Sequence, residues 1–286
     1  MSYALKVSHL TKRYPSFALN DISFEVPEGC IMGFVGENGA GKTTTIKAIL
    51  NLIAKDAGKV FVYSTDMDSD EKQAKRNIAV VFDDCCFSET LSISNVVRIM
   101  SRMYPGWDSR LFYEYADAFK LPEKKIIKEY SKGMKMKLSI ASALACRAKL
   151  LILDEATSGL DPIVRSEIID IFLEHIQNGQ NSILFSTHIT SDLDRIADYI
   201  TFIHEGKIVF SEAKDAMLDS YAILKCEEKE FRRLDSNDIV GVRKNMFGYE
   251  VLTDRKNEVL RRQPGIVYEK ALIEDIMLFY TKEDVR

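Results

Sequence analysis

The segment GENGAGKT, residues 36–43, limits the possible folds more than any other part of this chain. It satisfies the pattern G-x-x-x-x-G-K-[ST], and it follows the apolar run CIMGFV, which has the length of a buried strand. In a strand-loop-helix unit of this kind, glycines let consecutive backbone N–H groups converge on phosphate oxygens, and the following helix adds its positive end. The pattern therefore predicts a phosphate-binding loop within an α/β fold.

Each residue type in this loop has a chemical task. We expect Lys42 to neutralise the β- and γ-phosphates of a nucleotide, and the hydroxyl of Thr43 to ligate Mg²⁺. Thr44 is expected to add a further phosphate contact. The remaining contacts to phosphate are expected from the other loop residues, which are Gly36, Glu37, Asn38, Gly39, Ala40 and Gly41.

Two other apolar runs of strand length lead directly into polar residues. The run LLILDE, residues 150–155, ends in two acids, and burying a carboxylate there is costly unless a cation compensates. We therefore expect Asp154 to bind Mg²⁺, directly or through water, and Glu155 to act as the general base toward an attacking water. The run SILFST leads to His188, which we assign to a γ-phosphate contact and to orienting the same water.

Hydrophobic spacing divides the chain into a core and an appendage. Strand-like runs alternate with helical patterns, which predicts an α/β core over residues 1–212. Within it, residues 88–150 contain no convincing strand and are predicted to be a helical insertion, with Ser92 as an N-cap. Residues 213–286 are predicted to form a small α+β accessory domain with the short strands ILKCEE, VGVRK and GYEVLT.

The last predicted helix, ALIEDIMLFY, is amphipathic. Its apolar residues Leu272, Ile276, Phe279 and Tyr280 either dock the helix on its own small domain or contribute to a subunit interface. Both possibilities are open at this point.

Composition excludes several classes of protein. The net charge is −4 with both signs interspersed, so no basic surface for nucleic acid is expected. No apolar run approaches the ~18 residues that span a bilayer, and the N-terminus lacks the pattern of a secretory signal. The five cysteines are odd in number and lack metal-ligand spacing, so we expect reduced thiols and a cytoplasmic location.

The order of the motifs resembles that of the ATP-binding subunit of an ATP-binding-cassette (ABC) transporter over about residues 3–212. The motifs are an aromatic in LTKRY, the phosphate loop, YSKGM, LLILDE, SGLDP and STH. The resemblance implies a phosphate-loop NTPase core with an antiparallel β subdomain, a helical insertion, and bound ATP and Mg²⁺. It also implies an ATPase of a bacterial exporter, similar to subunits for peptide export or self-protection against antimicrobial peptides, held at the inner membrane face by a transmembrane permease subunit.

In this family two ATP-binding subunits pack head to tail, so that the signature of one subunit covers the γ-phosphate held by the other. By resemblance, Ser131 and Gly133 match this signature, and Met134, which like Tyr130 departs from the common LSGGQ, is assigned to the same nucleotide contact. Lys132 departs from the common signature and either adds positive charge near phosphate or faces solvent. Asp161 lies in SGLDP, the loop that connects the two active sites in the family. The second subunit is either a copy of this chain or a relative.

Two other positions are assigned by the same resemblance. Tyr14 is expected to stack on adenine, with Phe17 as the alternative. Asp83 stands where the family usually has a glutamine that meets Mg²⁺ and the permease, and a carboxylate is a competent Mg²⁺ ligand. The alternative function is a soluble ABC-type ATPase acting on translation, DNA or cluster assembly. Such proteins usually carry two cassettes or long coiled-coil insertions, which this chain lacks.

Overall fold

A six-stranded sheet lies at the centre of the computed structural model, which describes residues 2–281. The strand order is β10-β9-β3-β8-β7-β6, and every neighbouring pair is parallel except β10 with β9. The strands are β3 (Ile31–Val35), β6 (Ile78–Val81), β7 (Leu150–Asp154), β8 (Ser182–Thr187), β9 (Tyr199–His204) and β10 (Lys207–Ala213). The apolar runs predicted as strands at 31–35, 150–154 and 182–187 are therefore confirmed.

Both faces of this sheet are buried, because consecutive side chains of a strand point to opposite faces. In β7, Leu151 and Leu153 join one cluster of buried side chains, whereas Leu150 and Ile152 join the cluster on the other face. Burial on both faces requires a continuous apolar run rather than an alternating one, as is typical of parallel strands.

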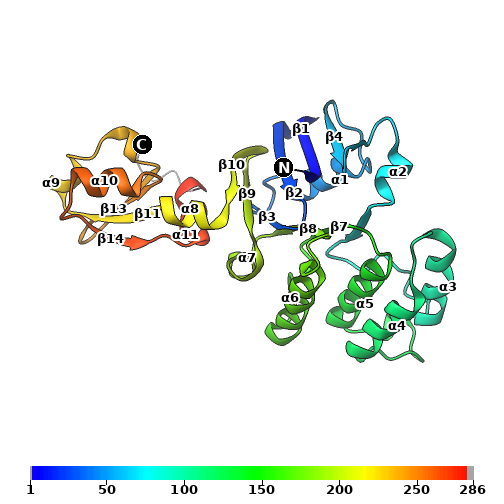
Figure 1. Cartoon of the computed structure of the whole chain (residues 1–286). Coiled ribbons are helices and arrows are strands. Elements are labelled where there is room, and N and C mark those ends of the chain that lie inside the picture. The colour runs from blue at the N-terminus through cyan, green and yellow to red at the C-terminus, as the bar shows by residue number, and fades with distance from the viewer. Residues whose placement is uncertain (1, 282–286) are drawn as a thin grey trace.

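An antiparallel sheet and one helix cover the first face (Figure 1). The sheet has the order β2-β1-β4-β5 and consists of β1 (Tyr3–Tyr14), β2 (Phe17–Pro27), β4 (Ala57–Val62) and β5 (Thr65–Asp66). The helix is α1 (Lys42–Ile49), which begins where the phosphate loop ends. Ile46 and Ile49 of α1 are fully buried between the two sheets, so the loop is held by a rigid support on both sides.

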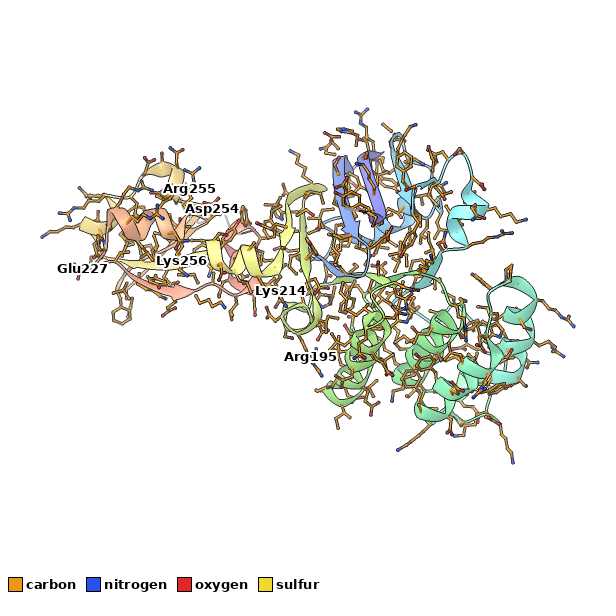
Figure 2. The ribbon with its side chains drawn as sticks, viewed as in Figure 1. Arg195, Lys214, Glu227, Asp254, Arg255 and Lys256 are labelled. Carbon is orange, nitrogen blue, oxygen red and sulfur yellow. The ribbon has the colours of Figure 1, made fainter. Side chains whose placement is uncertain are left out.

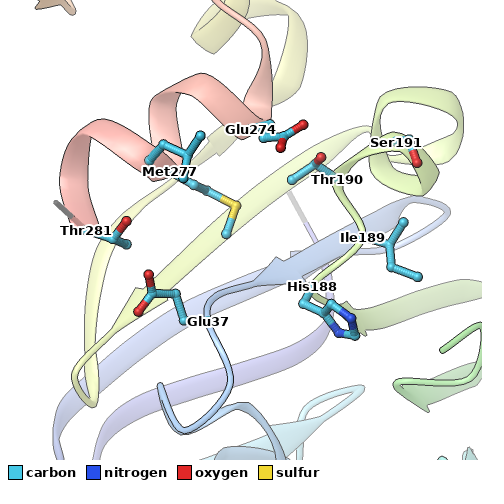
Figure 3. A pocket seen from close by; sticks show the side chains of 9 residues that line it. Glu37, His188, Ile189, Thr190, Ser191, Glu274, Met277 and Thr281 are labelled. Atoms are coloured by element: carbon cyan, nitrogen blue, oxygen red, sulfur yellow. The ribbon is translucent and has the colours of Figure 1, made fainter. Parts of the chain in front are cut away.

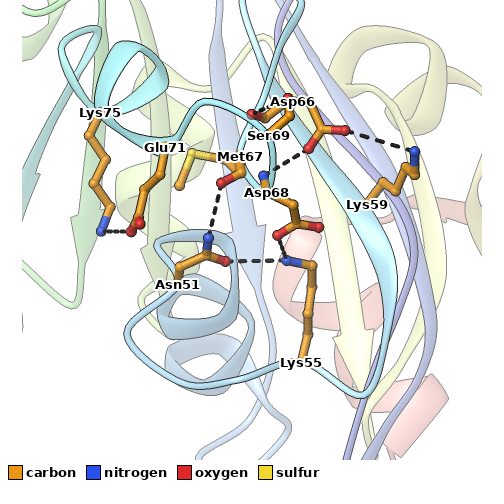
Figure 4. A network of polar contacts seen from close by, with 9 residues as sticks. All are labelled: Asn51, Lys55, Lys59, Asp66, Met67, Asp68, Ser69, Glu71 and Lys75. Carbon is orange, nitrogen blue, oxygen red and sulfur yellow. Dashed lines mark hydrogen bonds and ion pairs between the residues drawn. The ribbon is translucent and has the colours of Figure 1, made fainter.

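A polar network ties the end of α1 to the segment between β5 and α2 (Glu71–Lys75) (Figure 4). The Asn51 side chain donates to the Met67 carbonyl oxygen over 3.1 Å and accepts from Lys55 over 3.2 Å. Lys55 also pairs with Asp68. These contacts fix the residues that follow α1, and they pair the charge of Lys55, whose side chain is only 10% exposed.

Helices cover the second face of the central sheet (Figure 1). Those inserted between β6 and β7 are α3 (Ile93–Met103), α4 (Ser109–Ala118), the 3₁₀ turn η1 (Ile127–Glu129) and α5 (Lys132–Ala145). Two further helices, α6 (Pro162–Ile176) and α7 (Thr190–Ile196), complete the layer. Ser92 is the N-cap of α3 as predicted, and its backbone N–H donates to Asn95 Oδ1 over 3.1 Å.

The C-terminal part contains a second antiparallel sheet of order β12-β13-β11-β14. Its strands are β11 (Ala222–Cys226), β12 (Gly241–Asn245), β13 (Gly248–Thr253) and β14 (Val267–Lys270). Its helical elements are α8 (Lys214–Ser220), α9 (Glu228–Phe231), the 3₁₀ turn η2 (Ser236–Asp238), α10 (Lys256–Arg262) and α11 (Ile273–Thr281). The strands predicted near 223–228, 240–244 and 248–253 are present, whereas β14 was not predicted.

The last helix, α11, packs on both parts of the chain. Phe279 lies under the Arg243 guanidinium of β12, which is 4.0 Å from its ring centroid. The Tyr280 ring lies 5.9 Å from Phe202 of β9, and its hydroxyl lies 3.0 Å from that of Tyr221. The helix therefore docks on the sheet of its own domain, which was one of the two possibilities open from the sequence. It also packs on the central sheet.

A polar contact accompanies this packing at the junction of the two parts. Lys214, the first residue of α8, donates to the carbonyl oxygen of Asp194 in α7 over 2.9 Å. Figure 2 shows Lys214 at the junction of the two parts and Arg195 on the core beside α6. Within residues 2–281, no helix has both the length and the apolar character that crossing a bilayer requires.

Candidate nucleotide-binding site

The phosphate loop leaves the carboxyl end of β3 and enters α1, and two of its glycines are required by close packing. A Cβ on Gly36 would lie 2.4 Å from the carbonyl oxygen of Ile203. At Gly41, φ is 116° and a Cβ would lie 2.7 Å from Leu19 Cδ2. The loop is thus pressed against β9 and β2, and the free N–H groups of the first turn of α1 lie at its end.

Lys42 occupies the inside of the loop and is only 6% exposed. Its Nζ donates to the carbonyl oxygens of Gly36 and Glu37 over 2.7 and 3.2 Å. The same Nζ lies 3.2 Å from Glu155 Oε1. The loop therefore holds a fixed cation beside the helix N-terminus, an arrangement suited to an anionic ligand.

Asp154 is the last residue of β7 and is 2% exposed. Burial raises the pKa of this carboxyl group, and the nearby hydroxyls of Thr43 and Ser186 oppose that rise. Ser186 Oγ donates to Asp154 Oδ1 over 3.0 Å. Asp154 and Thr43, which come from separate parts of the sequence, are therefore close together at the end of the loop.

Glu155 turns away from the line of β7, because its φ of 54° lies in the left-handed region that non-glycine residues rarely adopt. Its Oε2 lies 2.7 Å from His188 Nδ1. Its Oε1 lies 3.2 Å from Lys42 Nζ, yet this oxygen is buried and makes no hydrogen bond. His188 is 40% exposed, so the chain Lys42, Glu155, His188 leads from the interior of the loop to the surface.

The residues predicted to hold Mg²⁺ fit its chemistry in part. Burial is the main cause of the raised pKa of Asp154, and the charge of Asp83, which is exposed, contributes to it. Over the described range, no group of three or more His, Cys, Asp and Glu side chains converges. Because Mg²⁺ typically takes only one or two carboxylates and completes its shell with substrate phosphates and water, Thr43 and Asp154 suit it. The orphaned Oε1 of Glu155 suits a water molecule.

The predicted signature residues gather at a different pocket, of about 280 Å³. Ser131 is the N-cap of α5, and its Oγ accepts from the N–H of Met134 over 3.2 Å. Asp161 is the N-cap of α6, and its Oδ1 accepts from two N–H groups of that helix at 3.1 and 3.0 Å. Both residues line this pocket together with Lys132 and Gly133.

The ammonium of Lys132 lies against the SGLDP loop: a Cβ added to Gly159 of this loop would lie only 2.6 Å from Lys132 Nζ. Neither Lys42 nor Glu155 lines the signature pocket. Within one chain, the two predicted halves of the nucleotide site are therefore separate.

The two aromatic candidates for adenine lie on either side of the turn that joins β1 and β2. Tyr14 is 43% exposed, and Lys12 Nζ lies 5.5 Å from its ring centroid. Phe17 is partly buried, and its ring lies 2.9 Å from where a Cβ on Gly41 would stand. Phe17, the alternative, is thus the aromatic residue in contact with the phosphate loop.

A pocket of about 410 Å³ adjoins the site and was not predicted (Figure 3). Glu37 and His188 line one side of it, and Glu274, Met277 and Thr281 of α11 line the other. The C-terminal helix therefore forms a wall beside the nucleotide site, although its sequence gave no sign of this position.

Sequence reasoning also assigned no role to three buried polar residues beside the site, Ser186, Thr157 and Asp192. Each makes a side-chain hydrogen bond to a residue more than 30 positions away, Ser186 to Asp154 and Thr157 to Asp192. For Ser186 the signal available in the sequence was a polar residue within the apolar run SILFST.

Comparison with known proteins agrees with this geometry. The family model described as ABC transporter matches residues 19–158. The chain is 31% identical over 260 residues to the bacitracin transport ATP-binding protein BcrA of Bacillus licheniformis, covering 89% of this chain and 84% of that protein. It is 32% identical over 214 residues to the lantibiotic transport ATP-binding protein SrtF of Streptococcus pyogenes, covering 74% and 91%.

A solved structure described as the ATP binding subunit of an ABC transporter has a TM-score of 0.68 at 26% identity, covering 76% of this chain and 92% of that one. The predicted fold, a nucleotide-binding α/β core with an antiparallel sheet and a helical insertion, is confirmed. The alternative of a soluble ATPase acting on translation, DNA or cluster assembly is not favoured, because the named relatives are transport proteins. This chain belongs to the ATP-binding subunits of ABC transporters, a family of ATPases that power transport.

Proposed function

We propose that this chain hydrolyses Mg-ATP in a dimer of ATP-binding subunits and so drives export through a separate transmembrane permease. The observation that carries the proposal is the contact chain from Lys42 through Glu155 to His188. It places a cation, a carboxylate and an imidazole in line at the mouth of a phosphate loop. In this arrangement Lys42 meets the phosphates and Glu155 meets the water.

Hydrolysis requires a base, and Glu155 is placed to serve as one. Its Oε1 lies 3.2 Å from Lys42 Nζ and accepts no hydrogen bond, so once the phosphates engage Lys42 it can accept the proton of a water whose oxygen attacks the γ-phosphorus. The P–O bond to ADP breaks, and ADP leaves with the electron pair. His188, 2.7 Å from Oε2, holds the carboxylate in position. Mg²⁺, when bound by Thr43 and Asp154, supplies positive charge to the phosphate oxygens.

The separation of the two half-sites supports a second ATP-binding subunit, either a copy of this chain or a relative. The pocket with Ser131 and Gly133 presents a helix N-terminus, a hydroxyl and the Lys132 ammonium, but it holds none of the phosphate-loop residues. A γ-phosphate reaches both half-sites when two subunits face each other head to tail. Asp161 then lies at their contact.

An apolar groove supports a permease partner. It has a volume of about 560 Å³ and lies between the central sheet and the helical insertion. Large apolar side chains line it, among them Phe82, Phe87, Ile99, Met103 and Tyr104. Ile99, Met103 and Tyr104 are 36%, 67% and 40% exposed, so the groove presents a contiguous apolar patch rather than one exposed side chain. A helix of the permease that packs in this groove would hold the chain at the inner face of the membrane.

The relatives suggest the kind of cargo. Their names refer to bacitracin, lantibiotics and daunorubicin or doxorubicin. The bacitracin relative is matched over nearly the whole of both chains. We propose peptide antibiotics as the exported class, with self-protection of the producing or exposed cell as the purpose.

The test is ATP hydrolysis by the purified chain, measured as phosphate release against protein concentration. Glu155→Gln is expected to lower turnover at least about 100-fold while ATP still binds, because it removes the base and preserves the shape. Glu114→Gln, an exposed acid on α4, is the control and is expected to match the wild type. Wild-type turnover should rise more steeply than linearly with concentration. Retention of a tenth or more of the turnover by Glu155→Gln would refute the assignment of the base.

A further inference from the structure

A buried acid outside the predicted site connects the segments that carry its reactive residues. Asp192 lies in α7, four residues after His188, and is 5% exposed. Its Oδ2 accepts from Thr157 Oγ1 over 2.8 Å. Its Oδ1 lies 3.3 Å from Nε of Arg165. Both oxygens of this carboxylate are therefore engaged by the protein.

The two partners of Asp192 belong to the segments that follow Glu155. Thr157 comes two residues after Glu155 and is fully buried. Arg165 lies in the first turn of α6, where its backbone N–H donates to the carbonyl oxygen of Asp161 over 3.0 Å. A single carboxylate thus joins the turn after the proposed base, the start of the helix capped by Asp161, and the helix that begins after His188.

Stability alone gives little reason for this arrangement. Burial raises the pKa of Asp192, against the opposing effects of the Thr157 hydrogen bond and the nearby Arg165 charge. Arg165 is 30% exposed and Asp192 is buried, and ion pairs that remove a charge from water in this way often contribute little net stability. What a buried, fully paired carboxylate does provide is a fixed geometry between the segments that it joins.

The same two helices have a second link that needs no buried charge. Arg195 of α7 donates to the Ser166 hydroxyl of α6 over 2.9 Å and pairs with Asp170 of α6. The side chains of Arg195 and Asp170 are exposed. The surface link already holds α6 against α7, so the buried link has a role other than packing the two helices.

We propose that Asp192 is a positioning residue for ATP hydrolysis, which sets Glu155 and His188 relative to each other through its contacts with Thr157 and Arg165. The proposal rests on the roles proposed above for Glu155 and His188. Asp192 touches neither the water nor the nucleotide. It acts by keeping the carboxylate of Glu155 and the imidazole of His188 within the observed 2.7 Å of each other.

The test compares two variants of one buried residue. Thr157→Val keeps the shape of the side chain and removes the hydroxyl that bonds Asp192, whereas Thr157→Ser keeps the hydroxyl and removes a methyl group. We expect Thr157→Val to lower kcat about tenfold with KM for ATP changed less than about twofold, because a small misplacement of reacting groups has effects of this order. Thr157→Ser should retain most of the wild-type kcat. Asp170→Asn, which breaks only the surface link, should behave as the wild type.

Thermal unfolding of each variant separates positioning from folding. Equal kcat for Thr157→Val and Thr157→Ser would overturn the proposal, as would a loss of kcat that follows the unfolded fraction. Glu155→Gln and His188→Ala are measured in the same series. Wild-type turnover in these two variants would overturn the proposed catalytic roles. If they are inactive while Thr157→Val is fully active, only the positioning role of Asp192 fails.

Discussion

Replacing Ser186 with alanine removes a hydroxyl that donates to the buried carboxylate of Asp154 over 3.0 Å. Both side chains are inaccessible to solvent, so no water takes the place of the lost donor. A hydrogen bond to a charged group contributes about 1.5–3 kcal/mol. We therefore expect the free energy of unfolding of the nucleotide-free protein to fall by about 2 kcal/mol at pH 8, and Tm to fall by about 4 °C.

The pH dependence of this loss identifies the bond. Burial raises the pKa of Asp154, and the bond from Ser186 lowers it, so the Ser186→Ala variant holds the carboxyl proton more tightly than the wild type. The bond contributes most when Asp154 is ionised, which is above its raised pKa in the folded protein. The difference in stability between wild type and variant should therefore be largest at pH 8. It should shrink as the pH falls through that pKa toward the ordinary value of 3.8.

Ser182 provides a matched control on the same strand. It is equally buried, and its Oγ accepts from the backbone N–H of Gly29 over 2.9 Å, a partner that does not titrate. Calorimetric unfolding from pH 4.5 to pH 8 should give a loss for Ser182→Ala that does not change with pH. A loss for Ser186→Ala that is constant over this range, or the same trend in both variants, would show that the bond to Asp154 is not what is lost.

Two further predictions concern the packing around the site. Tyr221→Phe and Tyr280→Phe should each destabilise the protein by about 1 kcal/mol in urea unfolding, because each change leaves one hydroxyl of a 3.0 Å hydrogen bond unpaired. The double variant should lose less stability than the sum of the two single losses. Additive losses would contradict this contact. Gly36→Ala should lower stability by about 1–3 kcal/mol and weaken ATP binding, because its Cβ would lie 2.4 Å from the Ile203 carbonyl oxygen. Gly265→Ala, with no atom within 4 Å of its Cβ, is the control for thermal unfolding, and equal Tm values for the two would refute the argument.

The strands of the central sheet were predictable because burial on both faces leaves only apolar residues. Ile152 and Leu184 are fully buried in runs with no polar residue beside them. By contrast, β14 reads VYEK and all four of its residues are exposed. It is a strand because it pairs with β11, at the edge of its sheet, and such long-range pairing has no signature in the segment itself.

Among the site residues too, those next to apolar strands were predictable from the sequence, and those that depend on long-range contacts were not. Asp154 ends β7, His188 directly follows β8, and Lys42 ends the loop that follows β3, so their approach at one edge of the sheet followed from the pattern. Thr157 lacked such a signal, because its hydroxyl matters only through Asp192, which is 35 residues away. Whether Tyr14 or Phe17 contacts the phosphate loop could not be predicted, because it depends on the tight turn between β1 and β2, which only the folded hairpin shows.

The position of α11 at the end of the chain has a consequence for co-translational folding. Synthesis proceeds from the N-terminus, and each domain generally folds as it emerges. When β9 has left the ribosome, the phosphate loop and the site carboxylates have already been synthesised. Tyr280, whose ring packs on Phe202 of β9, has not yet been made. The nascent ATP-binding core therefore carries an uncovered aromatic surface, open to chaperones or to aggregation, until the accessory segment has been made and its last helix has folded back.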